Sequence, residues 1–226
     1  MKNLIIIGAR GFGREVLQYV EDYNRENIKN QYNGPLYIDK RHHIKGFLDD
    51  DKSLEEKYNL KGYHILSSVY DYKIQKDDYF ICAIGDSYYK EKIYNYIKGN
   101  GGIFTTIIHP TSIIGRNVRV GEGCVFCPHT TISCDINIGK MVALNISTSV
   151  GHDASIGDFS TLSSHVDITG GVQLGEGVFI GSNASVLPKI KVGNHTIIGA
   201  MSLVAKDTPD NVTVVGVPAR IMEKRK

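Results

Sequence analysis

The stretch that decides the fold is Ile108-His-Pro-Thr-Ser-Ile-Ile-Gly-Arg-Asn-Val-Arg-Val-Gly-Glu-Gly-Cys-Val-Phe126, because it begins a pattern with a period of six residues. From Ile108 onward to Val204, every sixth residue is a large apolar one, and the phase never slips. The residue after each of these is most often glycine, and the residue two before it is small or β-branched. A period of six fits neither an α-helix nor a simple alternating strand.

This period fits a short strand followed by a tight turn, so that three sides make a triangular coil of about 18 residues. The apolar residue points inward and stacks on its counterpart one coil away. We expect the following glycine to lie in the turn and to adopt a positive φ there. Because one coil cannot bury its own face, stacking supplies the core, and residues 108–205 give about five coils of a parallel β-helix.

The first half of the chain has a different composition. All 13 tyrosines lie between Tyr19 and Tyr96, which places a domain boundary near residues 104–110. We predict strands at 3–7, 44–48 and 79–84, and helices at 14–23 and 88–97. Alternating strands and helices indicate a small parallel α/β sheet. The predicted domains are therefore 1–107, an α/β domain, and 108–226, an all-β β-helix with a C-terminal tail.

Composition excludes several classes of protein. The formal net charge is only +2 and charged residues make up 22% of the chain, so neither nucleic acid nor a membrane surface is an expected partner. No apolar run approaches the roughly 18 residues of a membrane span, and the run Leu4 to Ile7 is too short for a signal peptide. We therefore expect a cytoplasmic protein without membrane insertion.

A glycine loop follows the first predicted strand, with Gly8, Gly11 and Gly13 leading into a helix. Backbone amides at such a helix start suit a phosphate. Asp49-Asp50 and Gly85 close the next two predicted strands, at the edge where ligands of parallel sheets bind. We favour a nucleotide site here, and the alternative is an ordinary tight β–α turn.

His152 and Asp153 stand in the turn of one repeat, at positions that face solvent. A histidine with a pKa near neutrality can take a proton from an attacking amine or hydroxyl, and a neighbouring carboxylate can fix its tautomer. The alternative is an exposed histidine with no role, which also applies to His129, His165 and His195.

Cys124 and Cys127, with Cys134 nearby, raise the question of a metal. A zinc site needs four ligands, and no second Cys-x-x-Cys exists. Cys124 and Cys127 occupy small-residue slots of the repeat, so we expect packing and no metal. Hexapeptide-repeat carbonic anhydrases need two histidines five residues apart, a spacing that this chain lacks.

Several motifs together are similar to one known family. They are Ile7-Gly-Ala-Arg-Gly-Phe-Gly-Arg-Glu-Val16, Gly46-Phe-Leu-Asp-Asp50, Ala83-Ile-Gly85, His152-Asp153, Gly170-Gly-Val172 and Val215-Gly-Val-Pro-Ala-Arg220. Over nearly its whole length, the chain resembles the sialic acid O-acetyltransferase and UDP-amino-sugar N-acetyltransferase family of bacterial glycan pathways.

The resemblance implies a Rossmann-like N-terminal domain that holds a nucleotide-linked sugar, and a left-handed β-helix that forms a homotrimer with acetyl-CoA between adjacent β-helices. It assigns His152 as the general base, Asp153 as the carboxylate that raises its basicity, and Asn145 as a third catalytic residue. The implied nucleotide-sugar contacts are Arg10, Gly11, Phe12, Asp49, Asp50 and Gly85. The implied acetyl-CoA contacts are Thr161, Ser182 and Ala200.

The chain departs from the family pattern in three places. Many members carry histidine where Thr161 stands, and a Ser-Gly-His loop where this chain has Arg10-Gly11-Phe12. The segment 24–45 is longer than the usual connection, and we assign it no role.

The expected function is transfer of acetyl from acetyl-CoA to the amine of a nucleotide-activated amino sugar in bacterial surface-glycan biosynthesis. Backbone amides near Gly170-Gly171 would stabilise the oxyanion. O-acetylation of sialic acid or a related sugar is one alternative, and a non-catalytic β-solenoid scaffold is another. Serine acetyltransferases and hexapeptide nucleotidyltransferases would have different N-terminal domains.

Overall fold

The computed structural model describes residues 3–25 and 43–222, and most of the long 24–45 connection lies outside them. The N-terminal domain is a five-stranded parallel sheet in the order β3-β2-β1-β4-β5. Its strands are β1 (Asn3–Ile7), β2 (His43–Leu48), β3 (Ile65–Ser67), β4 (Asp78–Cys82) and β5 (Ile103–Phe104). Its helices are α1 (Gly11–Arg25), the short α2 (Leu54–Lys57) and α3 (Ser87–Gly99).

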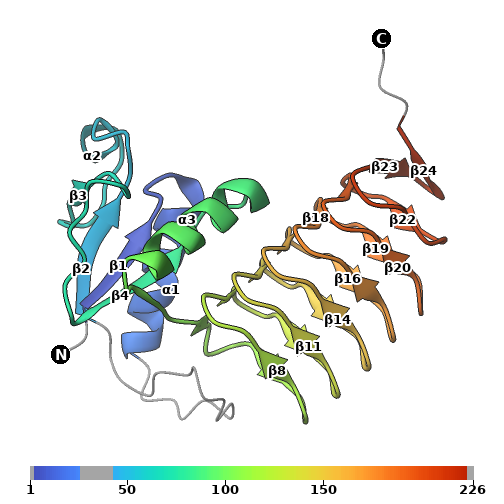
Figure 1. Ribbon diagram of the computed structural model, residues 1–226. Helices are drawn as coiled ribbons and strands as arrows, with labels where there is room; N and C mark the ends of the chain where they lie inside the picture. The colour runs from blue at the N-terminus through green and yellow to red at the C-terminus, as the bar shows by residue number, and fades with distance from the viewer. Residues whose placement is uncertain (1–2, 26–42, 223–226) are drawn as a thin grey trace.

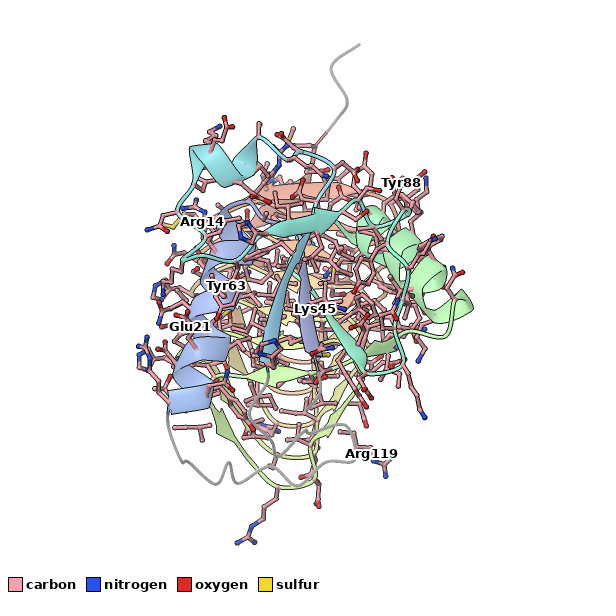
Figure 2. All side chains as sticks on the ribbon, turned by 90° about the vertical axis from the view of Figure 1, so that its left-hand side faces the viewer. Arg14, Glu21, Lys45, Tyr63, Tyr88 and Arg119 are labelled. Atoms are coloured by element: carbon pink, nitrogen blue, oxygen red, sulfur yellow. The ribbon has the colours of Figure 1, made fainter. Side chains whose placement is uncertain are left out.

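Strand β1 is the middle strand of this sheet. Helices α1 and α3 cover opposite faces of the sheet, so β1 is buried on both sides (Figure 2). Leu4 and Ile6 pack with the residues of α1, whereas Ile5 and Ile7 pack with those of α3. All four are fully buried, which explains why the strand is apolar throughout. The predicted α/β fold is confirmed; α1 begins three residues earlier than predicted, and β4 ends two residues before Ile84.

The rest of the chain is a left-handed β-helix whose two-residue strands form three parallel faces (Figure 1). Face 1 contains β6 (Ile107–Ile108), β9 (Val125–Phe126), β12 (Ala143–Leu144), β15 (Thr161–Leu162), β18 (Phe179–Ile180) and β21 (Ile197–Ile198), extended by β23 (Thr213–Gly216) and β24 (Ala219–Ile221). Face 2 contains β7 (Ile113–Ile114), β10 (Thr131–Ile132), β13 (Ser149–Val150), β16 (Asp167–Ile168), β19 (Ser185–Val186) and β22 (Leu203–Val204). Face 3 contains β8 (Arg119–Val120), β11 (Asn137–Ile138), β14 (Ser155–Ile156), β17 (Gln173–Leu174) and β20 (Lys191–Val192).

Each strand pairs with the equivalent strand of the next coil, as Ile132 does with Val150. The apolar residue of each strand points into one continuous core, in which Phe126, Leu144, Leu162 and Ile180 are fully buried. The predicted stacking of the six-residue column is therefore confirmed. No helix among residues 3–25 and 43–222 is long and apolar enough to cross a bilayer.

The expected role of the turn glycines is wrong. Positive φ values occur two residues later, for example at Asn117, Asp153 and Asn183, whereas the glycine directly after the apolar residue has an ordinary φ. That position requires glycine because of crowding between coils. At Gly157, an added Cβ would collide with the carbonyl group of Gly175 in the next coil.

This crowding is systematic at the corner between face 3 and face 1, which we call the third corner. Each of its turns has glycine after the apolar residue, at Gly121, Gly139, Gly157, Gly175 and Gly193. Side chains from the next coil lie over three of these glycines and accept hydrogen bonds from backbone amides. The pairs are Asp158 with the Lys140 amide at 2.9 Å, Asn194 with the Glu176 amide at 2.8 Å, and Asp210 with the Asn194 amide at 2.7 Å.

The N-terminal domain lies against face 1 of the early coils. Helix α1 contacts the corner between faces 1 and 2, the first corner, where the ring of Tyr19 meets that of His109 at a centroid distance of 5.6 Å. Helix α3 contacts the third corner, where the Tyr94 hydroxyl donates to Glu122 at 2.6 Å. The later coils extend away from the domain, and β23 and β24 lie at their far end (Figure 1).

Candidate active site

A cavity of about 500 Å³ lies at the carboxyl edge of the N-terminal sheet, and we call it the sheet-edge cavity. It brings together five of the six predicted nucleotide-sugar residues: Arg10, Phe12, Asp49, Asp50 and Gly85. The sixth, Gly11, is exposed at the start of α1 and does not line the cavity. The remaining lining residues are Ile7, Gly8, Leu48, Asp51, Val69, Tyr70, Ala83, Ile84, Tyr89 and Ile93.

The glycine loop beside this cavity is shaped by close packing. Gly8 has a φ of 96°, in the region that favours glycine. A Cβ on Gly13 would collide with the carbonyl oxygen of Gly8, so α1 can begin this close to β1 only with glycine there. The helix start is therefore pressed against the strand end, beside the cavity that Arg10 and Phe12 line.

The three neighbouring carboxylates, Asp49, Asp50 and Asp51, make different contacts. Asp49 accepts hydrogen bonds from the amides of Ala9 at 2.9 Å and Asp51 at 3.0 Å, so it holds the glycine loop in place. Hydrogen bonds from Ser53 lower the pKa of Asp51, which also lies 3.8 Å from the Arg10 guanidinium. Asp50 is exposed at the cavity and bonds to no side chain or backbone group of the described residues.

A second cavity of about 330 Å³ lies between the N-terminal domain and the β-helix, and we call it the interdomain cavity. Phe12 and Gly85 line both cavities, so the two adjoin. The predicted residues Asn145, Thr161 and Ser182 lie here. Its other lining residues are Glu15, Ser163, Ser164 and Phe179.

Thr161 lies at a contact between the two domains. Its hydroxyl donates to the carbonyl of Gly85 at 2.7 Å and accepts from the Lys90 ammonium at 2.8 Å. Lys90 is 1% exposed and also donates to the carbonyls of Met141 and Ser160, each at 3.0 Å. Burial lowers the pKa of Lys90 to about 8. This buried cation could not be found from the sequence, because α3 also carries Lys92 and Lys98 and no pattern singles out Lys90.

Asn145 and Ala200 lie on the first corner. The Asn145 side chain donates to the Leu162 carbonyl at 2.9 Å, which fixes its amide on the turn. Ala200 is exposed one coil beyond Ser182, outside the lining of the interdomain cavity.

His152 and Asp153 lie on the second corner, between faces 2 and 3. The His152 Nδ1 atom lies 2.7 Å from the Asp153 carboxylate, and both side chains are about two-thirds exposed, at 66% and 67%. The ring lies against Gly170 of the next coil, since a Cβ there would be 2.6 Å from Nε2. Within one chain, this corner lies opposite face 1, so the structure does not bring His152 to Asn145 or to either cavity.

Two cysteines of the repeat, Cys124 and Cys127, are packing residues. Cys124 and Cys127 are fully buried, and the Cys124 thiol donates to the Gly139 carbonyl at 3.1 Å. Burial raises the pKa of Cys124 to about 12 and raises that of Cys127 further. Thiols held in the neutral form pack like small apolar side chains.

Comparison with known proteins matches both halves of the chain. Residues 3–97 match the PglD N-terminal domain, and residues 171–206 match the bacterial transferase hexapeptide family (six repeats). A curated GDP-perosamine N-acetyltransferase of Escherichia coli O157:H7 is 28% identical over 136 residues, which are 60% of this chain. The matched stretch spans 55% of that relative's own length.

Solved structures match over almost the whole chain. WeeI from Acinetobacter baumannii AYE has a TM-score of 0.82 and 29% identity, covering 98% of this chain and all of its own. PerB from Caulobacter crescentus, solved in complex with CoA and GDP-perosamine, has a TM-score of 0.84 and 26% identity, covering 99% of this chain and 98% of its own.

Proposed function

We propose that this chain, which belongs to the hexapeptide-repeat acyltransferases with a PglD-type N-terminal domain, transfers acetyl from acetyl-CoA to the amine of a nucleotide-linked amino sugar. The observation that carries the proposal is the adjoining pair of cavities, which share Phe12 and Gly85. One cavity is built on a nucleotide-binding sheet edge, and the other lies on the β-helix. Two substrates bound in them would have their reacting ends at the shared residues.

The nucleotide-sugar would bind in the sheet-edge cavity. The helix start and the Arg10 guanidinium favour phosphate oxygens. The exposed Asp50, which bonds to none of the described residues, offers an acceptor for ribose hydroxyls or base N–H groups. The relative and the complexed structure named above act on or bind an amino sugar linked to GDP, which supports an amine acceptor over a hydroxyl.

Acetyl-CoA would bind along the first corner. Asn145, Ser182 and Ala200 follow this corner from coil to coil beside the interdomain cavity. Thr161 contributes to its wall, although its hydroxyl is already bonded to Gly85 and Lys90.

His152 would be the general base. Asp153 accepts the hydrogen bond from Nδ1–H, which leaves Nε2 with a lone pair for the proton of the attacking amine. The amine attacks the thioester carbonyl, and the CoA thiolate leaves as the tetrahedral intermediate collapses. Close positioning of donor and acceptor would supply much of the rate.

The oxyanion would have fewer donors than the sequence suggests. The Gly171 amide already donates to the His152 carbonyl at 2.8 Å. The Gly170 amide has no acceptor among the described residues and is the donor that we propose for this role.

The active site would form between copies of the chain. His152 lies on the second corner, whereas the cavities lie on face 1 and the first corner. A cyclic homotrimer of parallel β-helices would place the second corner of one copy next to the first corner of another. We also propose the division at 107/108, a cytoplasmic location and a role in bacterial surface-glycan synthesis.

The test is CoA release with acetyl-CoA and a panel of GDP-, UDP- and dTDP-linked amino sugars and sialic acid. Replacing His152 by alanine should leave the fold intact and reduce the turnover rate by about 10²–10⁴-fold. The matched control is His195→Ala, because His195 is also exposed on a corner and its ring also lies against a glycine, Gly177. Near-wild-type turnover in His152→Ala would rule out the base assignment.

A further inference from the structure

Two exposed tyrosines form one side of the sheet-edge cavity and have no role in the mechanism above. Tyr70, in the loop after β3, is 53% exposed, and Tyr89, in the first turn of α3, is 57% exposed. Both line the cavity. Aromatic side chains usually stabilise a fold by being buried, and an exposed ring does not contribute in this way. Two exposed rings in the wall of one cavity therefore suggest that a ligand covers them when it binds.

The chain holds both residues in place. The Tyr96 hydroxyl donates to the Tyr70 carbonyl at 2.6 Å, and the two rings meet edge to face at a centroid distance of 4.8 Å. The Tyr89 amide donates to Asp86, the residue that caps α3, at 3.0 Å. The backbones that carry the two rings are therefore fixed before any ligand arrives, which reduces the entropy lost on binding.

The cavity has two chemically different walls. Arg10 and the 49–51 carboxylates form the charged side, beside the start of α1. Tyr70 and Tyr89, with Val69 and Ile93, form the side next to α3, which covers the other face of the sheet from α1, and none of these four residues is charged. A ligand that matches both walls has anionic or hydroxyl groups on one side and a flat apolar ring on the other.

We propose that Tyr70 and Tyr89 are the residues on which the nucleobase of the nucleotide-linked sugar stacks, with its phosphates at Arg10 and the start of α1. The inference rests on the proposed function and adds detail to the nucleotide-sugar site. Tyr70 and Tyr89 form its base wall, and Arg10 with the start of α1 forms its phosphate wall. Every base has a π-face, so stacking supplies affinity without selecting one base. Discrimination among nucleotides then depends on hydrogen-bonding groups such as the exposed carboxylate of Asp50.

The test is calorimetric binding of GDP, UDP and dTDP to the full chain. Tyr89→Ala and Tyr70→Ala should each weaken binding by about 10- to 100-fold, whereas Tyr89→Phe should bind like the wild type, because stacking needs the ring and not the hydroxyl. The comparison variant is Tyr88→Ala, in which the adjacent tyrosine of α3 is removed (labelled in Figure 2). Tyr88 is 58% exposed and does not line the cavity. It meets the Tyr89 ring only edge to face, at a centroid distance of 5.6 Å, so its loss should weaken binding much less than the loss of Tyr89 itself. Unchanged melting temperatures would show that all variants fold.

Two results would overturn the proposal. One is equal binding by Tyr89→Ala and Tyr88→Ala, and the other is a loss in Tyr89→Phe as large as that in Tyr89→Ala. The chain contains no tryptophan, so tyrosine emission can be followed directly. Quenching by GDP should be smaller in the Tyr70→Ala/Tyr89→Ala variant.

Steady-state kinetics separate this proposal from the proposed function. If both hold, the tyrosine variants raise the KM for the nucleotide-sugar and leave the KM for acetyl-CoA unchanged. Tyrosine-dependent nucleotide binding without CoA release for any sugar would refute the acetyltransferase assignment alone. If both tyrosine variants transfer acetyl with an unaltered KM for the nucleotide-sugar, the base wall alone is refuted.

Discussion

His152 depends on a glycine that is distant in sequence. Its ring occupies the space beside Gly170 where any other residue would place a Cβ, 2.6 Å from Nε2. The ring is held on its other side by Asp153, which adopts a φ of 58°. Asparagine and aspartate are the residues other than glycine that tolerate this conformation best, so Asp153 suits both the turn and the imidazole.

We expect Gly170→Ala to displace the His152 ring and to reduce the rate of acetyl transfer by about tenfold or more, since an error of about 1 Å in position can cost 10²-fold. The corner is exposed, so the melting temperature should change little. Turnover of the purified variant, measured with saturating substrates, checks the prediction.

A double-variant cycle supplies the control. In a His152→Ala background, Gly170→Ala should cause no further loss of turnover, because the ring that it displaces is absent. Additive losses would mean that Gly170 acts on catalysis without His152, for example through its amide.

At the scale of the repeat, the third corner combines two rules. Glycine follows the apolar residue in each turn. At three of the five turns an aspartate or asparagine from the next coil occupies the space thus left and accepts a hydrogen bond from a backbone amide. A Cβ on Gly175 would lie 2.5 Å from the Asn194 side-chain oxygen, which shows the dependence directly. The two rules therefore stabilise the same corner through complementary shapes.

We predict that Gly157→Ala destabilises the β-helix by about 1–3 kcal/mol, because its Cβ would collide with the backbone of the next coil. Ser133→Ala is the matched control: Ser133 occupies the same place in a turn at the second corner, where the chain already carries a Cβ. Urea unfolding of both variants, followed by circular dichroism, measures the difference. Equal stability of the two would contradict the crowding explanation.

The repeat could be predicted from the sequence because each strand buries one residue, and this leaves a visible period. The reason for the glycines could not be predicted, because it depends on how closely two successive coils approach each other in the folded structure. The same holds for the cavities. Glu15 and Phe179 come from distant parts of the chain, and Tyr70 and Tyr89 are two of 13 tyrosines with no distinguishing spacing. Their positions at a strand end and a helix start were the only available signal.

The residues of the proposed active site and of the domain contact show the same division. His152 and Asp153 could be found because the resemblance and the turn position agree, and the structure places their side chains within 2.7 Å of each other. Lys90 could not be found from the sequence, because its burial depends on how the two domains pack against each other.

At the scale of the molecule, Lys90 is a buried cation at the contact between domains. Its folded-state pKa of about 8 lies below the ordinary value of 10.5, because burial disfavours the charged form. Between these two values the unfolded chain binds more protons than the folded chain, so this group makes stability rise with pH. Cys82, Cys124 and Asp86 also act on its charge.

We predict that the free energy of unfolding of the wild type, minus that of Lys90→Met, increases from pH 7 to pH 9, by at most about 1.4 kcal/mol per pH unit. The buried thiols titrate in both proteins and largely cancel in this difference. Urea unfolding at the two pH values gives the measurement. A constant or decreasing difference would mean that Lys90 does not titrate below its ordinary pKa in the folded state.

The opposed positions of His152 and Asn145 make a prediction about assembly. Mixed oligomers of two inactive variants, His152→Ala and Asn145→Ala, should regain part of the activity, because some interfaces then pair an intact second corner with an intact first corner. The mixture is unfolded and refolded together, and turnover is compared with that of each variant treated alone. Sedimentation should give three times the 25.0 kDa of one chain. No recovery in a mixed trimer would indicate that both residues act within one chain.

The unbroken six-residue phase from Ile108 to Val204 also behaves like a reading frame. Loss of one residue in an early turn would rotate every later apolar side chain out of the core, so the damage would extend to the end of the helix. Loss or gain of one whole coil would keep every pairing intact and would change only the height of the column. Such chains can therefore vary in length by whole coils while the docking surface for the N-terminal domain stays the same.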